Sequence, residues 1–452
     1  MGPTVKPKAP RLWYACVFLT LLGLTLMASF ESSADRAYMT EDDLVPIDFP
    51  VFYVGGKIAL QKGAQPLYYP PADRSQGYRL LHSRVDDSTA WAQVVRASGF
   101  SHTFPYTNPP FSALAMAPFA KMPWRQAYLA WQLLIITMTA AAIFLTLKLV
   151  PSESLFATFS ITLAAVCCFS PFRDNLILGQ VNALVLFLWV LGVCLLNRRQ
   201  PIASALCFAL GTVLKLAPAV AVPLLALRRQ WRWLVAYAVW VTGLAGVSVW
   251  RLGWQNNLTW LTAVYPGISC GVGNSDNRSL PGLIDALYAP GCVVSSQCPV
   301  PAGLCLFYKA CGVAAILVFL FWCWKKSKDA SGVIDELIVL PLVYLLVAPF
   351  AWGHHFLLAV FPLTYLWARS REATDAEVVT LSLSTLALGA VLPSYIAVSS
   401  PWARPLLTVL AIALWPAATS AIIWVGMRMY VRSRRGLDKQ PLAVGREHLT
   451  AA

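Results

Sequence analysis

The sequence predicts an all-α polytopic membrane protein, on the basis of its composition and its repeated apolar runs. Hydrophobic residues make up 58% of the 452 residues and charged residues only 12%, with a mean hydropathy of +0.61. Soluble domains are typically about one quarter charged. Runs of about 20 apolar residues, enough for a helix to cross a hydrocarbon core of about 30 Å, recur between Leu12 and Val431.

The charge distribution predicts the orientation of the chain. The net charge is +14, but the basic residues form short clusters between apolar runs, a pattern that sets membrane topology and does not indicate a nucleic-acid partner. Nine of the 21 acidic residues fall between Glu31 and Asp87. If the basic clusters are cytoplasmic, both termini are cytoplasmic and functional groups should collect on the external face.

The first apolar run, Leu12 to Phe30, is predicted to be a retained helix, because it is long and no small-residue cleavage site follows it. An external segment, 31–123, comes next. It contains a predicted helix at Phe52 to Lys62, a second amphipathic stretch at 67–81, and the run Phe111 to Phe119, which is too short to span and is bounded by proline. We expect this last run to be interfacial or re-entrant.

The remaining apolar runs bring the prediction to about twelve transmembrane helices. They form a single membrane domain, 1–431, with a second external loop at 252–303 and a basic cytoplasmic tail at 432–452. The predicted segments are Trp124 to Leu149, Leu155 to Ser170, Ile177 to Leu196, Pro201 to Leu227, Trp231 to Arg251, Leu304 to Trp324, Val333 to Phe350, His354 to Trp367, Val378 to Val398 and Ala403 to Tyr430.

The run Pro201 to Leu227 is predicted to be a broken hairpin. Arginine clusters flank it at both ends, and both should face the cytoplasm. Pro218 interrupts helical hydrogen bonding, and Gly211 lowers helix preference. Lys215, near the turn, is an ion at membrane depth that needs an anion, unless it snorkels to the headgroups.

The eleven cysteines divide by location. Seven lie in or next to apolar runs and are expected to be small buried hydrophobes. The others lie in or beside the second external loop, where an oxidising compartment permits disulfides. Cys292 and Cys298 are the easiest pair, with free thiols as the alternative.

The predicted topology brings a set of polar residues to the external ends of helices, which suggests a cavity there. Asp48 stands among apolar neighbours, where burial raises the pKa of a carboxyl group and can prepare a general base. More ordinary roles compete: loop aspartates are often solvated or cap helices, the histidines can cap a helix, and the amides can join helices. The set comprises Asp48, Asn108, Asp174, Gln180, Asn182, Asn277, Arg278, His354 and His355.

Six ordered segments carry a resemblance to glycosyltransferase family 87, which has the GT-C membrane fold. Together they extend from about Asp48 to Pro362. The segments are DFPVFYVGGKIALQKGAQPLYYP, YTNPPFSALAMAPFAKMP, LGQVNALVLFLWVLGV, GTVLKLAPAVAVPLLALRRQWR, NRSLPGL and WGHHFLLAVFP.

The resemblance implies an inverting transfer of a sugar, with mannose expected, from a polyprenyl-phosphate donor to a lipid or glycan hydroxyl. It implies an integral protein of a bacterial inner membrane whose site faces the periplasm or exterior. Asp48 would be the general base, without a cofactor. Lys215, Arg278, His354 and His355 would bind the donor phosphate, and the sugar or acceptor would contact Gln180, Asn182, Asn277, Asn108, Tyr53, Tyr106 and Trp352.

Four alternatives remain open. Adjacent carboxylates at Glu41, Asp42 and Asp43 can hold a divalent metal, although a solvated acidic turn is the commoner outcome. A lipid-linked-sugar flippase or transporter also needs polar groups inside a bundle, and an arabinofuranosyltransferase shares the fold. A noncatalytic scaffold leaves Asp48 and Lys215 unexplained.

Overall fold

The computed structural model is an α-helical bundle, which confirms the predicted fold class. It describes residues 11–31, 48–61, 65–69, 89–100, 104–151, 154–269, 277–288, 302–326, 332–349, 351–389 and 403–438. No strand occurs within these ranges. The predictions at 41–43, at Cys292 and Cys298, and for most of 67–81 lie outside them. Cys305 is disulfide-bonded, and seven other cysteines are free thiols.

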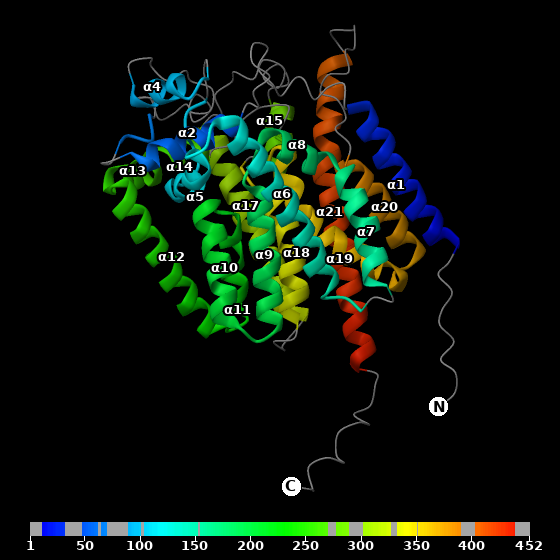
Figure 1. Cartoon of the computed structure of the whole chain (residues 1–452). Coiled ribbons are helices and arrows are strands. Elements are labelled where there is room, and N and C mark those ends of the chain that lie inside the picture. Colours follow the sequence, from blue (N-terminus) through cyan, green and yellow to red (C-terminus); the bar gives the residue numbers. More distant parts are fainter. Residues whose placement is uncertain are drawn as a thin grey trace.

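The longer helices stand side by side, and shorter helices cover one end of the bundle (Figure 1). The beginning of α1 and the end of α21 lie at the opposite end. The bundle comprises α1 (Arg11–Glu31), α6 (Trp124–Leu147), α7 (Leu155–Cys167), α9 (Asn182–Asn197), α10 (Pro201–Leu214), α11 (Ala221–Leu227), α12 (Trp231–Leu252), α17 (Ala302–Lys326), α18 (Val333–Val347), α19 (Val360–Arg369), α20 (Asp375–Gly389) and α21 (Ala403–Asp438).

The covering elements come mostly from the two segments predicted to be external. Most are only one to three turns long. They are α2 (Phe49–Leu60), α4 (Ala90–Ala97), α5 (Pro110–Ala120), α8 (Ser170–Leu178), α13 (Trp254–Thr259), the π-helical η3 (Trp260–Val264), α14 (Tyr265–Ile268) and α15 (Leu280–Tyr288).

The predicted count of about twelve spans is not confirmed. Among the described residues, four helices are long and apolar enough to cross a membrane, or five if the bent pair α7 and α8 is one span. The four are Trp124–Leu147, Trp231–Leu252, Gly303–Lys326 and Ile412–Arg432. Several other bundle helices are shorter, because the chain is interrupted within them.

The first interruption separates α7, α8 and α9. The sequence predicted two straight helices here, Leu155 to Ser170 and Ile177 to Leu196. Instead, α7 and α8 meet at 66°, and α8 ends where Gly179 adopts a left-handed conformation with φ of +66°. The next helix therefore begins only at Asn182, and the loop between them presents Gln180.

The second interruption is the predicted broken hairpin. α10 ends at Leu214, Lys215 is extended (φ −160°, ψ 123°), and the 3₁₀ turn η2 (Ala217–Val220) leads into α11. A Cβ on Gly211 would stand only 2.8 Å from Pro218 Cγ, so the glycine lets the two arms approach. The free carbonyl of Leu214 accepts a hydrogen bond of 2.7 Å from Ser112 Oγ of α5, which satisfies the broken backbone.

α2 starts earlier than predicted and packs against α5. The prediction placed its first residue at Phe52, but the helix begins at Phe49 with Pro50 in its first turn. Gly56 lies against Met116 of α5, where an added Cβ would be 3.0 Å from that residue's carbonyl carbon. The predicted run Phe111 to Phe119 is confirmed as α5. This packing puts Asp48, directly before α2, at the end of the bundle.

Candidate active site

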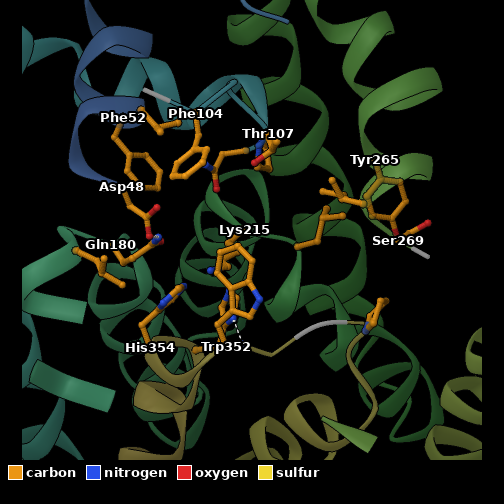
Figure 2. Close-up of a pocket in the computed structure, with 18 of the residues that line it drawn as sticks. Asp48, Phe52, Phe104, Thr107, Gln180, Lys215, Tyr265, Ser269, Trp352 and His354 are labelled. Carbon is orange, nitrogen blue, oxygen red and sulfur yellow. Dashed lines mark hydrogen bonds between the residues drawn. The ribbon is translucent and has the colours of Figure 1, made fainter. Parts of the chain in front are cut away.

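A cavity of about 390 Å³ lies beneath the short helices at this end of the bundle. Figure 2 shows Asp48, Gln180, Lys215, His354 and Trp352 facing it, with Tyr265 and Ser269 across from them. Eight of the predicted site residues line the cavity: Asp48, Asn108, Gln180, Lys215, Arg278, Trp352, His354 and His355. Asp174 lines it too. Residues 306 positions apart in the chain thus share one site.

Asp48 is the N-cap residue of α2, but its carboxylate does not cap the helix. Asp48 Oδ2 instead accepts a hydrogen bond of 2.7 Å from Gln180 Nε2. Burial raises the pKa of Asp48 to about 6, although the Gln180 hydrogen bond and the positive charge of Lys215 both act to lower it. Near neutral pH the group is therefore ionised yet poised to take up a proton.

Gly179 positions this pair. Its left-handed conformation turns the chain so that Gln180 follows α8, and Trp131 Nε1 donates to the Gly179 carbonyl at 2.8 Å. Phe49 packs directly on the glycine, since an added Cβ would lie 2.9 Å from Phe49 Cβ. Phe49 is the neighbour of Asp48, so the glycine sets the separation of carboxylate and amide.

The Gly179→Ala substitution should therefore lower turnover by more than its loss of stability can explain. A left-handed alanine costs about 1–2 kcal/mol, and displacement of Phe49 would move the Asp48 carboxylate, where an error of about 1 Å can cost about 10²-fold in rate. The measurements are kcat and thermal stability in detergent.

Gly99→Ala is the matched control for this change. Gly99 also has a positive φ, +85°, but an added Cβ there meets only Trp124 Nε1 at 3.9 Å, away from the cavity. It should lose similar stability and keep its turnover. Equal losses of turnover in the two variants would contradict the positioning role of Gly179.

Lys215 reaches the cavity because the helix breaks beside it. Its Nζ donates a hydrogen bond of 2.7 Å to Asn182 Oδ1. The Asn182 amide nitrogen in turn donates to the carbonyl oxygen of His354 at 3.1 Å. Asn182 is fully buried and lies outside the cavity lining, so its amide holds the ammonium group in place from behind the wall.

Arg278 supplies a second cation. Its backbone N–H donates to the Ala351 carbonyl at 2.9 Å, and its guanidinium lies over the ring of Trp415 at 4.2 Å. Arg278 Nη1 is buried and has no hydrogen-bond partner among the described residues. Such an orphaned donor on a cavity wall is suited to receive an anion.

Asp174 approaches the same place from α8. An added Cβ on Gly353 would lie 2.7 Å from Asp174 Oδ2 and 3.6 Å from Arg278 Nη1. The glycine therefore leaves the space in which a carboxylate and a guanidinium come close together. The sequence placed Asp174 near the site without a role, and the structure makes it the second carboxylate of the cavity.

The two histidines form a compact pair, with ring centroids 4.5 Å apart. The backbone N–H of Trp352 donates to His355 Nδ1 at 2.9 Å. A neutral His355 therefore carries its proton on Nε2, which makes that atom a donor. The His355 side chain thus caps the start of the 3₁₀ helix, which is the ordinary role that the sequence analysis allowed for the histidines. Both histidine side chains also line the cavity.

Three further predicted contact residues lie behind the lining. Asn277 is fully buried; its Nδ2 donates to the Pro349 carbonyl at 3.0 Å, and its Oδ1 accepts from the Ala351 N–H at 2.9 Å. Tyr53 donates to the Met122 carbonyl at 2.7 Å. Tyr106 packs beside Tyr68 and Trp91. With Asn182, these residues brace the walls, and the geometry gives no support to direct sugar contacts by them.

The sequence did not predict the apolar wall opposite Asp48. It includes Leu216, Trp260, Tyr265, Ile268 and Tyr344. Trp260 starts the π-helical turn η3, and its Nε1 donates to the Thr107 carbonyl at 3.1 Å. The sequence predicts 254–268 as part of an external loop, but these residues form α13, η3 and α14, and the run of apolar and amide residues after Gly253 is compatible with a helix.

No group of three His, Cys, Asp or Glu side chains suitable for a metal occurs in the part of the chain that the structure describes. The cations available to an anionic ligand in the cavity are instead the side chains of Lys215 and Arg278.

The fold and cavity define an integral membrane protein whose helical bundle holds the Asp48 carboxylate and the Lys215 and Arg278 cations in one cavity at one end. Residues 106–349 match the model of glycosyltransferase family 87. This match covers more than half of the chain, and the chain belongs to that family.

Curated relatives agree with this assignment. The chain is 27% identical over 293 residues to a polyprenol-phosphate-mannose-dependent α-(1-2)-phosphatidylinositol mannoside mannosyltransferase of Mycolicibacterium smegmatis, covering 60% of this chain and 63% of the relative. It is 26% identical to a protein of the same name from Mycobacterium tuberculosis, over 75% of this chain and 82% of the relative. A phosphatidylinositol pentamannoside mannosyltransferase of M. smegmatis is 26% identical over 74% of this chain and 72% of its own length.

Proposed function

We propose that this protein transfers a mannosyl residue from a polyprenyl-phosphate donor to a hydroxyl group of a lipid or glycan acceptor. The observation that carries the proposal is the sharing of one cavity by the Asp48 carboxylate and the Lys215 and Arg278 cations. The names of the relatives, which specify polyprenol-phosphate-mannose donors and phosphatidylinositol mannoside acceptors, support the choice of substrates.

Asp48 is the proposed general base. As the acceptor oxygen attacks the anomeric carbon, its proton passes to the Asp48 carboxylate. The glycosidic bond to the acceptor forms while the bond from the anomeric carbon to the phosphate oxygen breaks. Gln180 supports this role, because its amide holds one carboxylate oxygen, Oδ2, and leaves Oδ1 for the acceptor.

Lys215 and Arg278 are the proposed partners of the leaving group. The departing polyprenyl phosphate gains negative charge as a phosphate monoester, so it needs positive charge and not a strong acid. The ammonium of Lys215 is held by a neutral amide, and Arg278 keeps an unused donor. The side chains of His354 and His355 line the same cavity. Direct displacement between base and cations would invert the anomeric configuration.

The proposed site faces the non-cytoplasmic side of a bacterial inner membrane. The basic loops support this orientation, because Arg198 directly follows α9, Arg228 directly follows α11, and α19 ends at Arg369. These ends lie toward the end of the bundle opposite the short covering helices (Figure 1). A lipid-linked-sugar transporter is the less favoured alternative, because it requires polar groups distributed across the membrane depth, whereas the cavity residues gather at one end.

The test is sugar transfer by the purified full-length chain in nanodiscs. Polyprenyl-phosphate mannose and the corresponding arabinofuranose donor are compared with phosphatidylinositol mannosides as acceptors, and products are identified by mass spectrometry. We expect mannosylated product and free polyprenyl phosphate in equal amounts. Transfer from the arabinose donor alone would overturn the choice of mannose, and movement of intact donor across the bilayer without product would overturn the enzymatic proposal.

A further inference from the structure

A second hollow lies at the opposite end of the bundle, between α17 and α21. We call it the α17–α21 groove. It has a volume of about 430 Å³ and is lined by Trp322, Lys326, Trp424, Met427, Arg428, Val431 and Arg432. The apolar windows of both helices end here, at Lys326 and Arg432. The groove therefore lies at the level where two membrane-spanning helices leave the hydrocarbon core of the membrane.

The groove carries excess positive charge. Three cations line it, Lys326, Arg428 and Arg432, and among the described residues Arg428 and Arg432 form ion pairs with one carboxylate, Glu377 of α20. Arg432 Nη2 lies 2.5 Å from both Glu377 carboxylate oxygens, whereas Arg428 Nε makes a longer contact of 3.3 Å. The Arg428 side chain remains 57% exposed. Lys326 forms no ion pair with any described residue, so positive charge is left over for a ligand.

Aromatic rings and apolar side chains adjoin these cations. The Arg428 guanidinium lies 5.1 Å from the Trp424 ring, and Trp322 packs on Tyr430 at 5.5 Å. Indole rings at the end of a span favour the level of the lipid headgroups. Leu410 and Leu414 lie exposed on the same side of α21 as Trp424 and Arg428, toward the middle of the bundle.

We propose that the α17–α21 groove binds an anionic phospholipid. Its phosphate contacts Lys326 and Arg428, and an acyl chain lies along Trp424 and Leu414. Free phosphate shares the headgroup chemistry, but the position at the ends of two spans and the apolar stripe that continues from the cations favour a lipid. The site is separate from the Asp48 cavity and does not depend on the reaction there.

The experiment is a titration of the full-length, detergent-purified protein with phosphatidylglycerol, followed by native mass spectrometry. Each basic residue near an anionic lipid headgroup strengthens lipid binding about five-fold. Lys326→Gln should therefore weaken binding about five-fold, and Lys326→Gln with Arg428→Gln about 30-fold. Phosphatidylcholine, which has no net charge, should bind weakly to every variant.

Arg232→Gln is the matched control, because it removes an exposed arginine from the start of α12, outside the groove. It should bind phosphatidylglycerol as the unmodified protein does. Because Lys326 forms no ion pair within the part of the chain that the structure describes, its single variant separates lost binding from misfolding. The proposal is overturned by undiminished binding in the double variant, by an equal loss with Arg232→Gln, by equally tight phosphatidylcholine binding, or by complete displacement of the lipid by inorganic phosphate.

Discussion

Asp48→Asn should lower kcat for sugar transfer about 10³-fold, within the range of about 10²–10⁴ that general-base catalysis supplies. Asparagine has nearly the same shape and can still accept the Gln180 hydrogen bond, but it cannot take the acceptor's proton. Donor binding, measured by isothermal titration in nanodiscs, should stay close to that of the unmodified protein.

The matched control is Asp42→Asn. Asp42 belongs to the acidic run 41–43, whose carboxylates would hold a divalent metal under the alternative hypothesis. It should retain full turnover with or without chelator. Full activity of Asp48→Asn would remove the general-base assignment, and strong inactivation of Asp42→Asn, reversed by added Mg²⁺ or Mn²⁺, would direct attention to metal-assisted chemistry.

The pH profile gives a second readout on the same carboxylate. A base must be deprotonated to act, and the pKa of Asp48 is raised to about 6. The value of kcat/KM should therefore rise about ten-fold per pH unit below this pKa and level off above it. The residual activity of Asp48→Asn should lack this acidic limb.

Lys215→Met should lower kcat/KM about 10²–10³-fold, the usual effect of removing one group that stabilises developing negative charge. Methionine fills a similar volume without the ammonium group. The positive charge of Lys215 also lowers the pKa of Asp48. Its loss should therefore move the acidic limb of the pH profile above about 6, which a purely structural defect would not do.

Lys57→Met is the control for this change. Lys57 lies on α2 with its ammonium 5.3 Å from the Tyr53 ring, outside the cavity lining. It should leave rate and pH profile unchanged. A Lys215→Met protein with normal turnover and an unmoved acidic limb would contradict the electrostatic role of Lys215.

Sequence reasoning predicted best the features that depend on local composition. The helix class, α5 and the long apolar helices follow from run length and bounding prolines. The break at Lys215 followed from a conflict between charge clusters, and it brought an ammonium group into the cavity. The early end of α8 depends on the left-handed conformation of Gly179 and its contact with Phe49, and packing of that kind is not visible in a composition window.

The site was predicted in part for a related reason. Polar residues in apolar surroundings stand out, and eight of them do line one cavity. Which of the predicted polar residues line the cavity, and which support its walls from behind, depends on the direction of each side chain. Asn182 points toward Lys215 and His354, and Asn277 points toward the 349–351 backbone. The aromatic wall at Trp260 and Tyr265 was missed, because aromatic residues are common throughout this chain.

The Asn182 amide joins three separate parts of the chain: its own helix α9, the break at Lys215 and the 3₁₀ turn at His354. None of the three can shift without disturbing the others, so the charged half of the cavity behaves as one rigid part. The aromatic half, from Trp260 to Ile268, is not tied to it through this amide. Divergence in acceptor choice within such a scaffold would therefore proceed through the aromatic half, while the charged half and its chemistry are inherited unchanged.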